Sequence, residues 1–149
     1  MTSTDARPSD APVVDPATEL GAKAADRLRT DGIIWLTTTG ANGTPQPNPV
    51  WFLWEDGEFL LFSIPNQAKL RNIARNPRVA LNLNTAGGND VVILTGTARI
   101  DDQPPTDAEI AAYTEKYTPG LASLNMTPEK FYATYSVPVR ITPDRLRGF

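Results

Sequence analysis

Three prolines alternate with other residues along one predicted strand, at Pro45, Pro47 and Pro49. Successive backbone N–H groups of a strand point to opposite edges, so the three missing donors all fall on the same edge. The other edge keeps its donors and can pair with a neighbouring strand. One edge of this strand therefore cannot join a regular hydrogen-bonded ladder and must face solvent, a ligand or another chain.

The same strand carries two amide side chains. Gln46 and Asn48 share a face with Val50, Phe52 and Trp54, so an inward-facing apolar stripe would place both amides at its end, where they need partners. Either the start of the strand protrudes and the amides meet water, or they lie at the mouth of an apolar groove. We favour the groove, since amides there suit the carbonyl and N–H edge of a flavin-type ring. Gln46, Asn48 and Val50 are thus candidate cofactor contacts.

The rest of the 149-residue chain reads as short strands joined by tight turns, with a few helices. The pattern predicts strands at 33–39, 44–55, 58–64, 79–84, 90–101, 137–141 and 145–149, and helices at 17–29, 67–75, 106–117 and 128–134. Residues 1–18 are rich in Ser, Thr, Asp, Pro and Ala and are predicted to form a disordered tail. We expect one domain over 19–149, mainly β (α+β): a six- or seven-stranded antiparallel β-barrel with flanking helices.

The chain contains no cysteine and no histidine. This excludes disulfides, thiolate nucleophiles, Cys/His zinc sites and a Ser–His triad, and we expect no metal site. Without imidazole, acid–base catalysis near neutral pH would need a strongly shifted carboxylate or lysine. If the protein is an enzyme, a bound cofactor is expected to carry the chemistry. We assign no catalytic side chain. Tyr and Ser side chains near a cofactor cleft are the candidate proton donors.

A basic stretch follows the strand at 58–64. Residues 65–84 include Lys69, Arg71, Arg75 and Arg78 and no acidic residue, in a chain of net charge −3. Such a stretch at the start of a helix favours an anion, most simply a phosphate, although most charge runs are solvated helix faces. The acidic balance of the whole chain provides no broad basic surface for nucleic acid.

No segment approaches the roughly 20 apolar residues needed to span a bilayer. The N-terminus is polar and lacks the apolar region of a signal peptide. We therefore expect no membrane insertion and a cytoplasmic location.

Four segments carry a family resemblance: Thr44–Trp51, Leu61–Ile64, Ala68–Ile73 and Asn76–Leu81. Together they resemble the pyridoxamine 5'-phosphate oxidase-like split β-barrel superfamily, most closely the actinobacterial F420-dependent flavin/deazaflavin oxidoreductases. The resemblance implies a split-barrel fold and a homodimer with the cofactor cleft at the subunit interface.

The resemblance also assigns site residues. It implies that Phe62, Ser63 and Ile64 line the isoalloxazine-like ring and that Lys69 binds the cofactor phosphate. It places Gln67 and Ala68 in the binding turn, with Arg71, Asn72 and Arg75 as nearby helpers. Trp35, Trp51 and Trp54 are candidates for the interface or the core, and core packing is the better interpretation of each.

The activity implied by the resemblance is hydride transfer from reduced coenzyme F420 to a small organic acceptor such as a quinone or an enone. Two alternatives stay open. The cofactor could be FMN in the same fold, or the protein could bind or store F420 without catalysis.

Overall fold

The computed structural model describes residues 11–149, and within this range seven strands and four helices form an α+β split barrel, as predicted. The strands are β1 (Ile34–Thr39), β2 (Pro45–Val50), β3 (Leu53–Glu55), β4 (Glu58–Ser63), β5 (Arg78–Leu83), β6 (Val92–Ile100) and β7 (Val137–Gly148). The helices are α1 (Glu19–Thr30), α2 (Ala68–Arg75), α3 (Asp107–Ser123) and α4 (Pro128–Thr134). Among the described residues, no helix has the length and apolar character required to cross a membrane.

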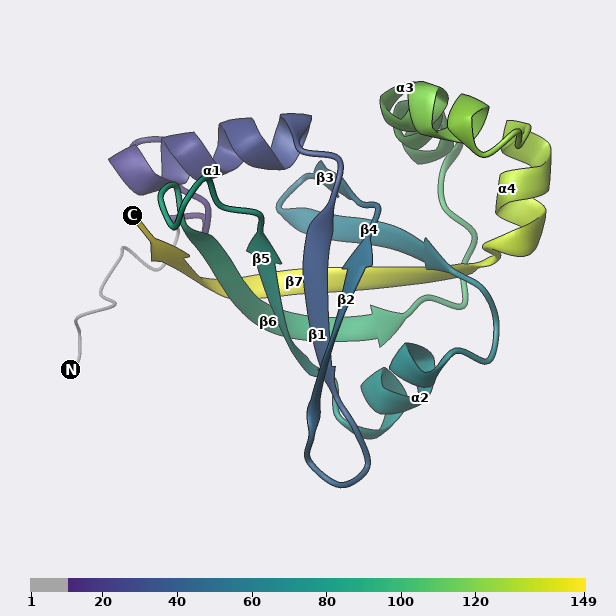
Figure 1. Cartoon of the computed structure of the whole chain (residues 1–149), viewed down its shortest axis with the longest axis horizontal. Helices are drawn as coiled ribbons and strands as arrows, with labels where there is room; N and C mark the ends of the chain where they lie inside the picture. The colour runs from purple at the N-terminus through teal and green to yellow at the C-terminus, as the bar shows by residue number, and fades with distance from the viewer. Residues whose placement is uncertain (1–10) are drawn as a thin grey trace.

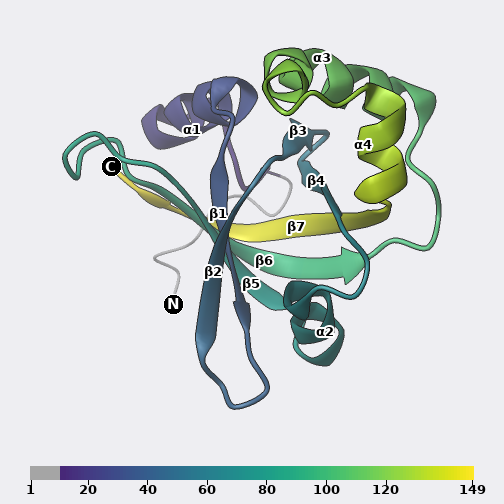
Figure 2. The ribbon, with the colours of Figure 1, turned by 45° about the vertical axis from the view of Figure 1, so that its right-hand side comes forward.

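The strands form one curled antiparallel sheet in the order β2-β1-β5-β6-β7-β4-β3 (Figure 1). Its two edge strands, β2 and β3, are joined by only Trp51 and Phe52. The chain therefore leaves the sheet at one edge and re-enters it at the other, which brings the two edges together at the split of the barrel. Figure 2 shows this crossing beside the helices α3 and α4.

The predicted single strand at 44–55 is therefore wrong. Its break at Phe52 is stabilised from outside the sheet: the hydroxyl of Tyr117 in α3 accepts from the Phe52 N–H at 2.8 Å and lies 3.1 Å from the Phe52 carbonyl. Backbone groups that leave a sheet need other partners when they are buried. Here a distant helix supplies them, and no local turn residue marks the break.

The proline pattern is confirmed as the mark of an edge strand. In the part of the chain that the structure describes, β2 pairs only with β1, and Pro45, Pro47 and Pro49 lie exposed on it. The hairpin-closing bond from the Gly40 N–H to the Thr44 carbonyl sets the register, so the prolines occupy the positions whose backbone faces away from β1. The outer edge of β2 therefore lacks donors at alternate positions.

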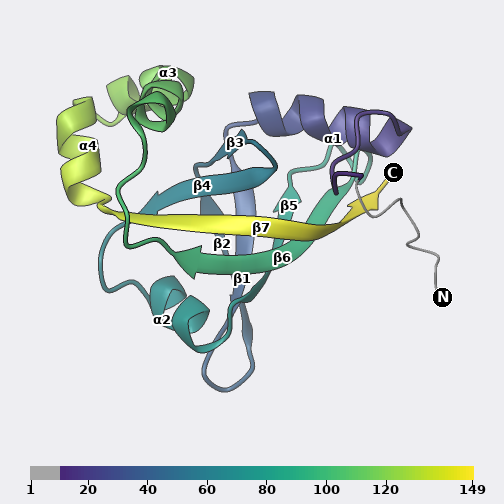
Figure 3. The same cartoon turned by 180° about the vertical axis from the view of Figure 1, so that it is seen from behind.

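Two apolar clusters meet on β4, because both faces of this strand are covered. Phe59 and Leu61 point into the barrel, whereas Leu60 and Phe62 pack with α3 and α4 on the outside. Figure 3 shows these helices at one end of the sheet and α1 at the other. The alternation along β4 thus fixes α3 and α4 beside the split.

Two further elements differ from the prediction. The strands expected at 137–141 and 145–149 are one strand, β7, whose register shifts so that Thr95 pairs with Arg145 and Gly96 with Pro143. This bulge accommodates a proline within a paired strand. Helix α3 continues to Ser123, past the predicted end at residue 117.

The predicted disordered tail lies mostly outside the described residues, since residues 1–10 are not described. The part from residue 11 onward contacts the folded domain at two points. Val14 is buried in the barrel core, and Thr18 caps α1 by accepting from the Gly21 N–H. Val14 and Thr18 therefore contribute to the packing of the domain.

Candidate functional site

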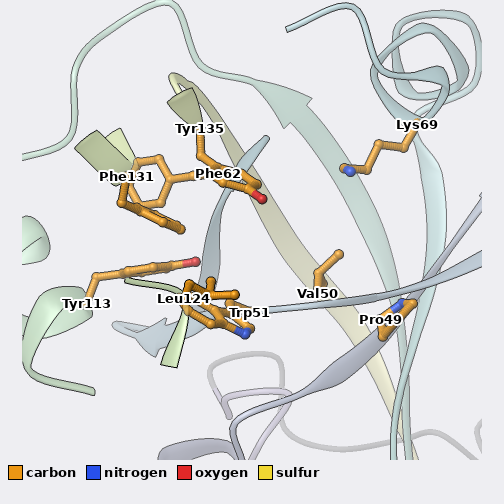
Figure 4. Close-up of a pocket in the computed structure, with 9 residues that line it drawn as sticks. All are labelled: Pro49, Val50, Trp51, Phe62, Lys69, Tyr113, Leu124, Phe131 and Tyr135. Atoms are coloured by element: carbon orange, nitrogen blue, oxygen red, sulfur yellow. The ribbon is translucent and has the colours of Figure 1, made fainter. Parts of the chain in front are cut away.

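A cleft of about 310 Å³ lies at the split of the barrel. Its walls come from the end of β2, from β4, and from the helices α2, α3 and α4 (Figure 4). The lining residues are Pro49, Val50, Trp51, Phe62, Lys69, Tyr113, Leu124, Phe131 and Tyr135. All but one are apolar or aromatic, which is typical of a ligand pocket with a few polar anchors.

Lys69 is the one charged residue in this lining. Its side chain is half-buried, and it has no hydrogen bond or ion pair within residues 11–149. Figure 4 shows its ammonium group directed from α2 toward the cleft. Burial lowers the pKa of Lys69, because desolvation disfavours the charged form. An anion in the cleft would offset this cost.

The other cations of the basic stretch do not face the cleft. Arg71 donates to the Asn66 carbonyl at 2.8 Å on the surface, and Arg75 donates to Asn72 Oδ1 at 2.9 Å. Arg78 pairs at the surface with Asp144, which the bulge in β7 brings beside it. This pairing lowers the pKa of Asp144. The stretch therefore does have a compensating carboxylate, from a distant strand, and only Lys69 reaches the cleft.

Two of the predicted site residues form an internal amide network. The buried Asn72 donates from Nδ2 to Thr38 Oγ1 at 3.0 Å and to Gln46 Oε1 at 2.8 Å. Its Oδ1 accepts the bond from Arg75. These contacts fasten α2 to β1 and β2. The amides of Gln46 and Asn72 thus position the helix that carries Lys69.

Of the twelve predicted cofactor contacts, Val50, Phe62 and Lys69 line the cleft together. The remaining predicted residues are not part of its lining. Asn48 is exposed on β2, the buried Ser63 donates to its neighbour's carbonyl at 2.9 Å, and Ile64 is half-buried. Gln67 and Ala68 are the N-cap and first residue of α2.

Trp51 packs against the apolar cluster beneath α3 and α4, in line with the predicted core packing, and it also lines the cleft. Its ring stacks on Tyr117 with centroids 4.4 Å apart and an interplanar angle of 4°. The close approach depends on Gly120 in α3, where an added Cβ would lie 2.8 Å from Cζ2 of Trp51. The break between β2 and β3 thus turns this indole onto the face of α3. Trp54 instead packs against Phe59 in the core.

The sequence prediction missed the lining residues that lie in α3 and α4 or at their C-caps. These are Tyr113, Leu124, Phe131 and Tyr135. A signal was present, because Tyr113 and Tyr117, like Phe131 and Tyr135, are four residues apart and share one side of a helix turn. The pattern shows an aromatic face, but it contains no information on where that face docks.

Comparison with known proteins places these features in a family. A family model described as pyridoxamine 5'-phosphate oxidase matches residues 20–135. A conserved hypothetical protein of Mycobacterium tuberculosis, Rv2991, is 27% identical with a TM-score of 0.68, over 87% of this chain and 82% of that one. No curated protein matches.

Two more distant structures share the fold. An F420 reductase is 23% identical with a TM-score of 0.61, over 82% of this chain and 94% of that one. HutZ, a haem storage protein from Vibrio cholerae, is 14% identical with a TM-score of 0.64, over 88% of this chain and 95% of that one. At these identities the similarity establishes the split-barrel fold alone.

Proposed function

Because this chain belongs to the pyridoxamine 5'-phosphate oxidase family, we propose that it is an oxidoreductase that holds a phosphate-bearing ring cofactor in the cleft at the split. The observation that carries this proposal is Lys69, a half-buried ammonium without a partner in the described chain, directed into an otherwise apolar cleft. The donor set fits the cofactor: a cation for the phosphate and aromatic walls for a flat ring.

We propose coenzyme F420 as the cofactor. The F420 reductase among the solved structures supports this choice, as does the resemblance of the four sequence segments. A reduced deazaflavin supplies a hydride to a bound acceptor. The protein then has to orient the ring against the acceptor and exclude water, and the aromatic walls serve both purposes. Neither task needs the histidine or cysteine that the chain lacks.

FMN is the alternative cofactor, and colour distinguishes the two. Protein purified from a host without F420 is expected to be colourless and to bind added F420. A yellow preparation with a flavin absorbance band would overturn the choice of F420 while keeping the proposed cleft. A phosphate-binding lysine alone is compatible with either.

The first prediction concerns Lys69. Lys69→Ala removes one charge-assisted hydrogen bond to phosphate, so the Kd for F420 should rise about ten- to hundredfold. The measurement is a fluorescence titration of F420 with wild-type and variant protein. Arg71→Ala is the matched control, because this exposed cation on the same helix does not line the cleft. Equal affinities of wild type and Lys69→Ala would move the phosphate site elsewhere.

Storage without catalysis is the second candidate function, since a haem storage protein shares the fold. It predicts tight F420 binding and no turnover with any quinone, enone or nitro compound. Turnover of a single such compound with reduced F420 would refute the storage function.

We also propose that the protein is a homodimer whose second copy covers the cleft. Pro49 belongs both to the exposed edge of β2 and to the cleft lining, so a subunit seated on this edge would border the site. Sedimentation equilibrium at micromolar concentration tests it, and a monomer would refute it.

A further inference from the structure

A second cavity, of about 470 Å³, lies between α1 and α3 and is bordered by β3. Figure 1 shows β3 between these two helices. The lining residues are Leu28, Arg29, Leu53, Trp54, Glu55, Ala112, Glu115 and Lys116. None of them lines the cleft at the split, so the two cavities have separate walls.

Lys116 is half-buried at this second cavity and contacts the crossover between β2 and β3. Its ammonium donates to the Phe52 carbonyl at 2.9 Å and lies 3.7 Å from the centroid of the Phe52 ring. It forms no ion pair within residues 11–149. Its polar partner is thus a neutral carbonyl, in place of the carboxylate that a buried ammonium normally requires.

The charged and titratable groups around this amine come from every element that borders it. They are Arg29 and Asp31 at the end of α1, Glu55 of β3, and Glu115 and Tyr117 of α3. The two α1 residues are paired within their own helix region, Arg29 with Asp26 at 2.5 Å and Asp31 with Arg27 at 2.6 Å. Burial lowers the pKa of Lys116 to about 8, and attraction to the carboxylate of Asp31 opposes this shift in part. A substantial fraction of the amine is therefore uncharged in mildly basic solution.

The lining indicates which reagent such an amine would meet. Half of the lining residues are apolar, and they are Leu28, Leu53, Trp54 and Ala112. They offer contact to a short hydrocarbon chain. The carboxylates of Glu55 and Glu115 disfavour a phosphate leaving group next to the reacting carbon, because like charges repel. An acyl thioester meets both conditions, since its carbonyl carbon and sulfur carry no charge.

We propose that Lys116 is a site of covalent acylation by short-chain acyl thioesters, with the acyl chain seated in this second cavity. The uncharged amine attacks the carbonyl carbon of the thioester and forms a C–N bond. The C–S bond breaks, its electron pair leaves with the thiolate, and the nitrogen releases one proton to solvent. The product amide keeps an N–H for the Phe52 carbonyl but loses the positive charge at the crossover. This site does not depend on the proposed cofactor.

Acetyl and butyryl thioesters of N-acetylcysteamine are the probes. The full-length protein is incubated with each at a series of pH values, and acylation of every lysine is followed by peptide mass spectrometry. Lys130, exposed on α4, is the internal control. At neutral pH Lys116 should react about tenfold faster than Lys130, because the larger uncharged fraction outweighs the weaker nucleophilicity of a weaker base. The rate at Lys116 should reach half of its plateau near pH 8.

The length of the acyl chain tests the cavity separately from the basicity of the amine. The ratio of butyryl to acetyl rates should be about threefold higher at Lys116 than at Lys130, because the added CH₂ groups contact apolar lining. Ala112→Leu fills part of the cavity from α3 and should abolish this difference, with urea denaturation to show that the variant folds. Lys116→Arg should remove the fast-reacting site and leave the rate at Lys130 unchanged.

Three results would overturn the inference. They are equal acylation rates at Lys116 and Lys130, equal chain-length ratios at the two lysines, and a chain-length difference that persists in folded Ala112→Leu. None of these measurements involves F420, so failure of cofactor binding would refute the proposed function and leave this site unaffected.

Discussion

Lys69 illustrates why a basic stretch cannot be interpreted residue by residue from sequence. Four basic residues, Lys69, Arg71, Arg75 and Arg78, lie within ten positions. Each side chain has a different environment. Arg78 meets a carboxylate from a bulge in a distant strand, and Arg75 completes a network around a buried amide. Of the four, only Lys69 points into the cleft, and it has no partner within residues 11–149. The family resemblance predicted that Lys69 binds the cofactor phosphate. This role stays a prediction until the Kd for F420 is measured for wild type and Lys69→Ala.

The absence of a partner leads to a prediction on stability. A half-buried ammonium without a carboxylate is disfavoured in the unliganded fold, so Lys69→Met should raise the Tm of the free protein. The same change should weaken F420 binding. Differential scanning calorimetry without and with F420 measures both effects, and Arg71→Met on the surface should leave both unchanged. A lower Tm for free Lys69→Met would contradict this account of the site.

At the scale of elements, α2 depends on Asn72 for its position. The side chain is 5% exposed and joins the helix to β1 and β2 through Thr38 and Gln46. Asn72→Ala leaves the buried Thr38 hydroxyl without this partner, so it should lower the free energy of unfolding by about 1–3 kcal/mol. Urea denaturation measures this change.

The same variant distinguishes a positioning residue from a cofactor contact. If Asn72 acts only through α2, Thr38→Val should weaken F420 binding in the same direction, because it removes one end of the same link. If Asn72 instead contacts the cofactor, Asn72→Ala should weaken binding and Thr38→Val should have no effect. The network predicts the first outcome.

The elements themselves show which parts of the fold are predictable from sequence. Local signals placed the Asp56-Gly57 turn and the start of α4 at Pro128 correctly. The break at Phe52 and the extension of α3 were missed, because both depend on contacts between distant segments. Tyr117 replaces the strand partners of Phe52, and Gly120 packs under Trp51 beyond the point where Pro119 suggests a helix end. Since the cleft is assembled from these contacts, the aromatic half of its lining was not predictable.

At the scale of the whole molecule, one ion cluster connects α3 to the barrel. Arg140 of β7 binds both carboxylate oxygens of Glu109, at 2.6 and 2.9 Å, and its Nε donates to Asp101 at 2.7 Å. Glu109 lies in the first turn of α3 and also completes its capping box with Thr106. The cluster therefore holds the helix that carries Tyr113 against the sheet.

This arrangement makes stability depend on pH in a defined window. The hydrogen bonds from Arg140 lower the pKa of Glu109 from 4.5 to about 2. A carboxyl whose pKa is lower in the folded state contributes its full stability above the unfolded pKa and loses it as the pH falls through the folded value. The free energy of unfolding should therefore decrease between about pH 4.5 and pH 2, with a contribution of about 3 kcal/mol from this group.

Glu109→Gln tests the cluster as the source of this dependence. The variant should be less stable than wild type at pH 7, because Arg140 loses its bidentate partner while remaining largely buried. The difference should shrink as the pH falls, since wild-type Glu109 becomes protonated and the two proteins converge near pH 2. Urea denaturation at intervals from pH 7 to pH 2 measures the two curves, with Glu115→Gln on the exposed side of α3 as the control. Parallel curves for wild type and Glu109→Gln would show that acid sensitivity arises elsewhere in the fold.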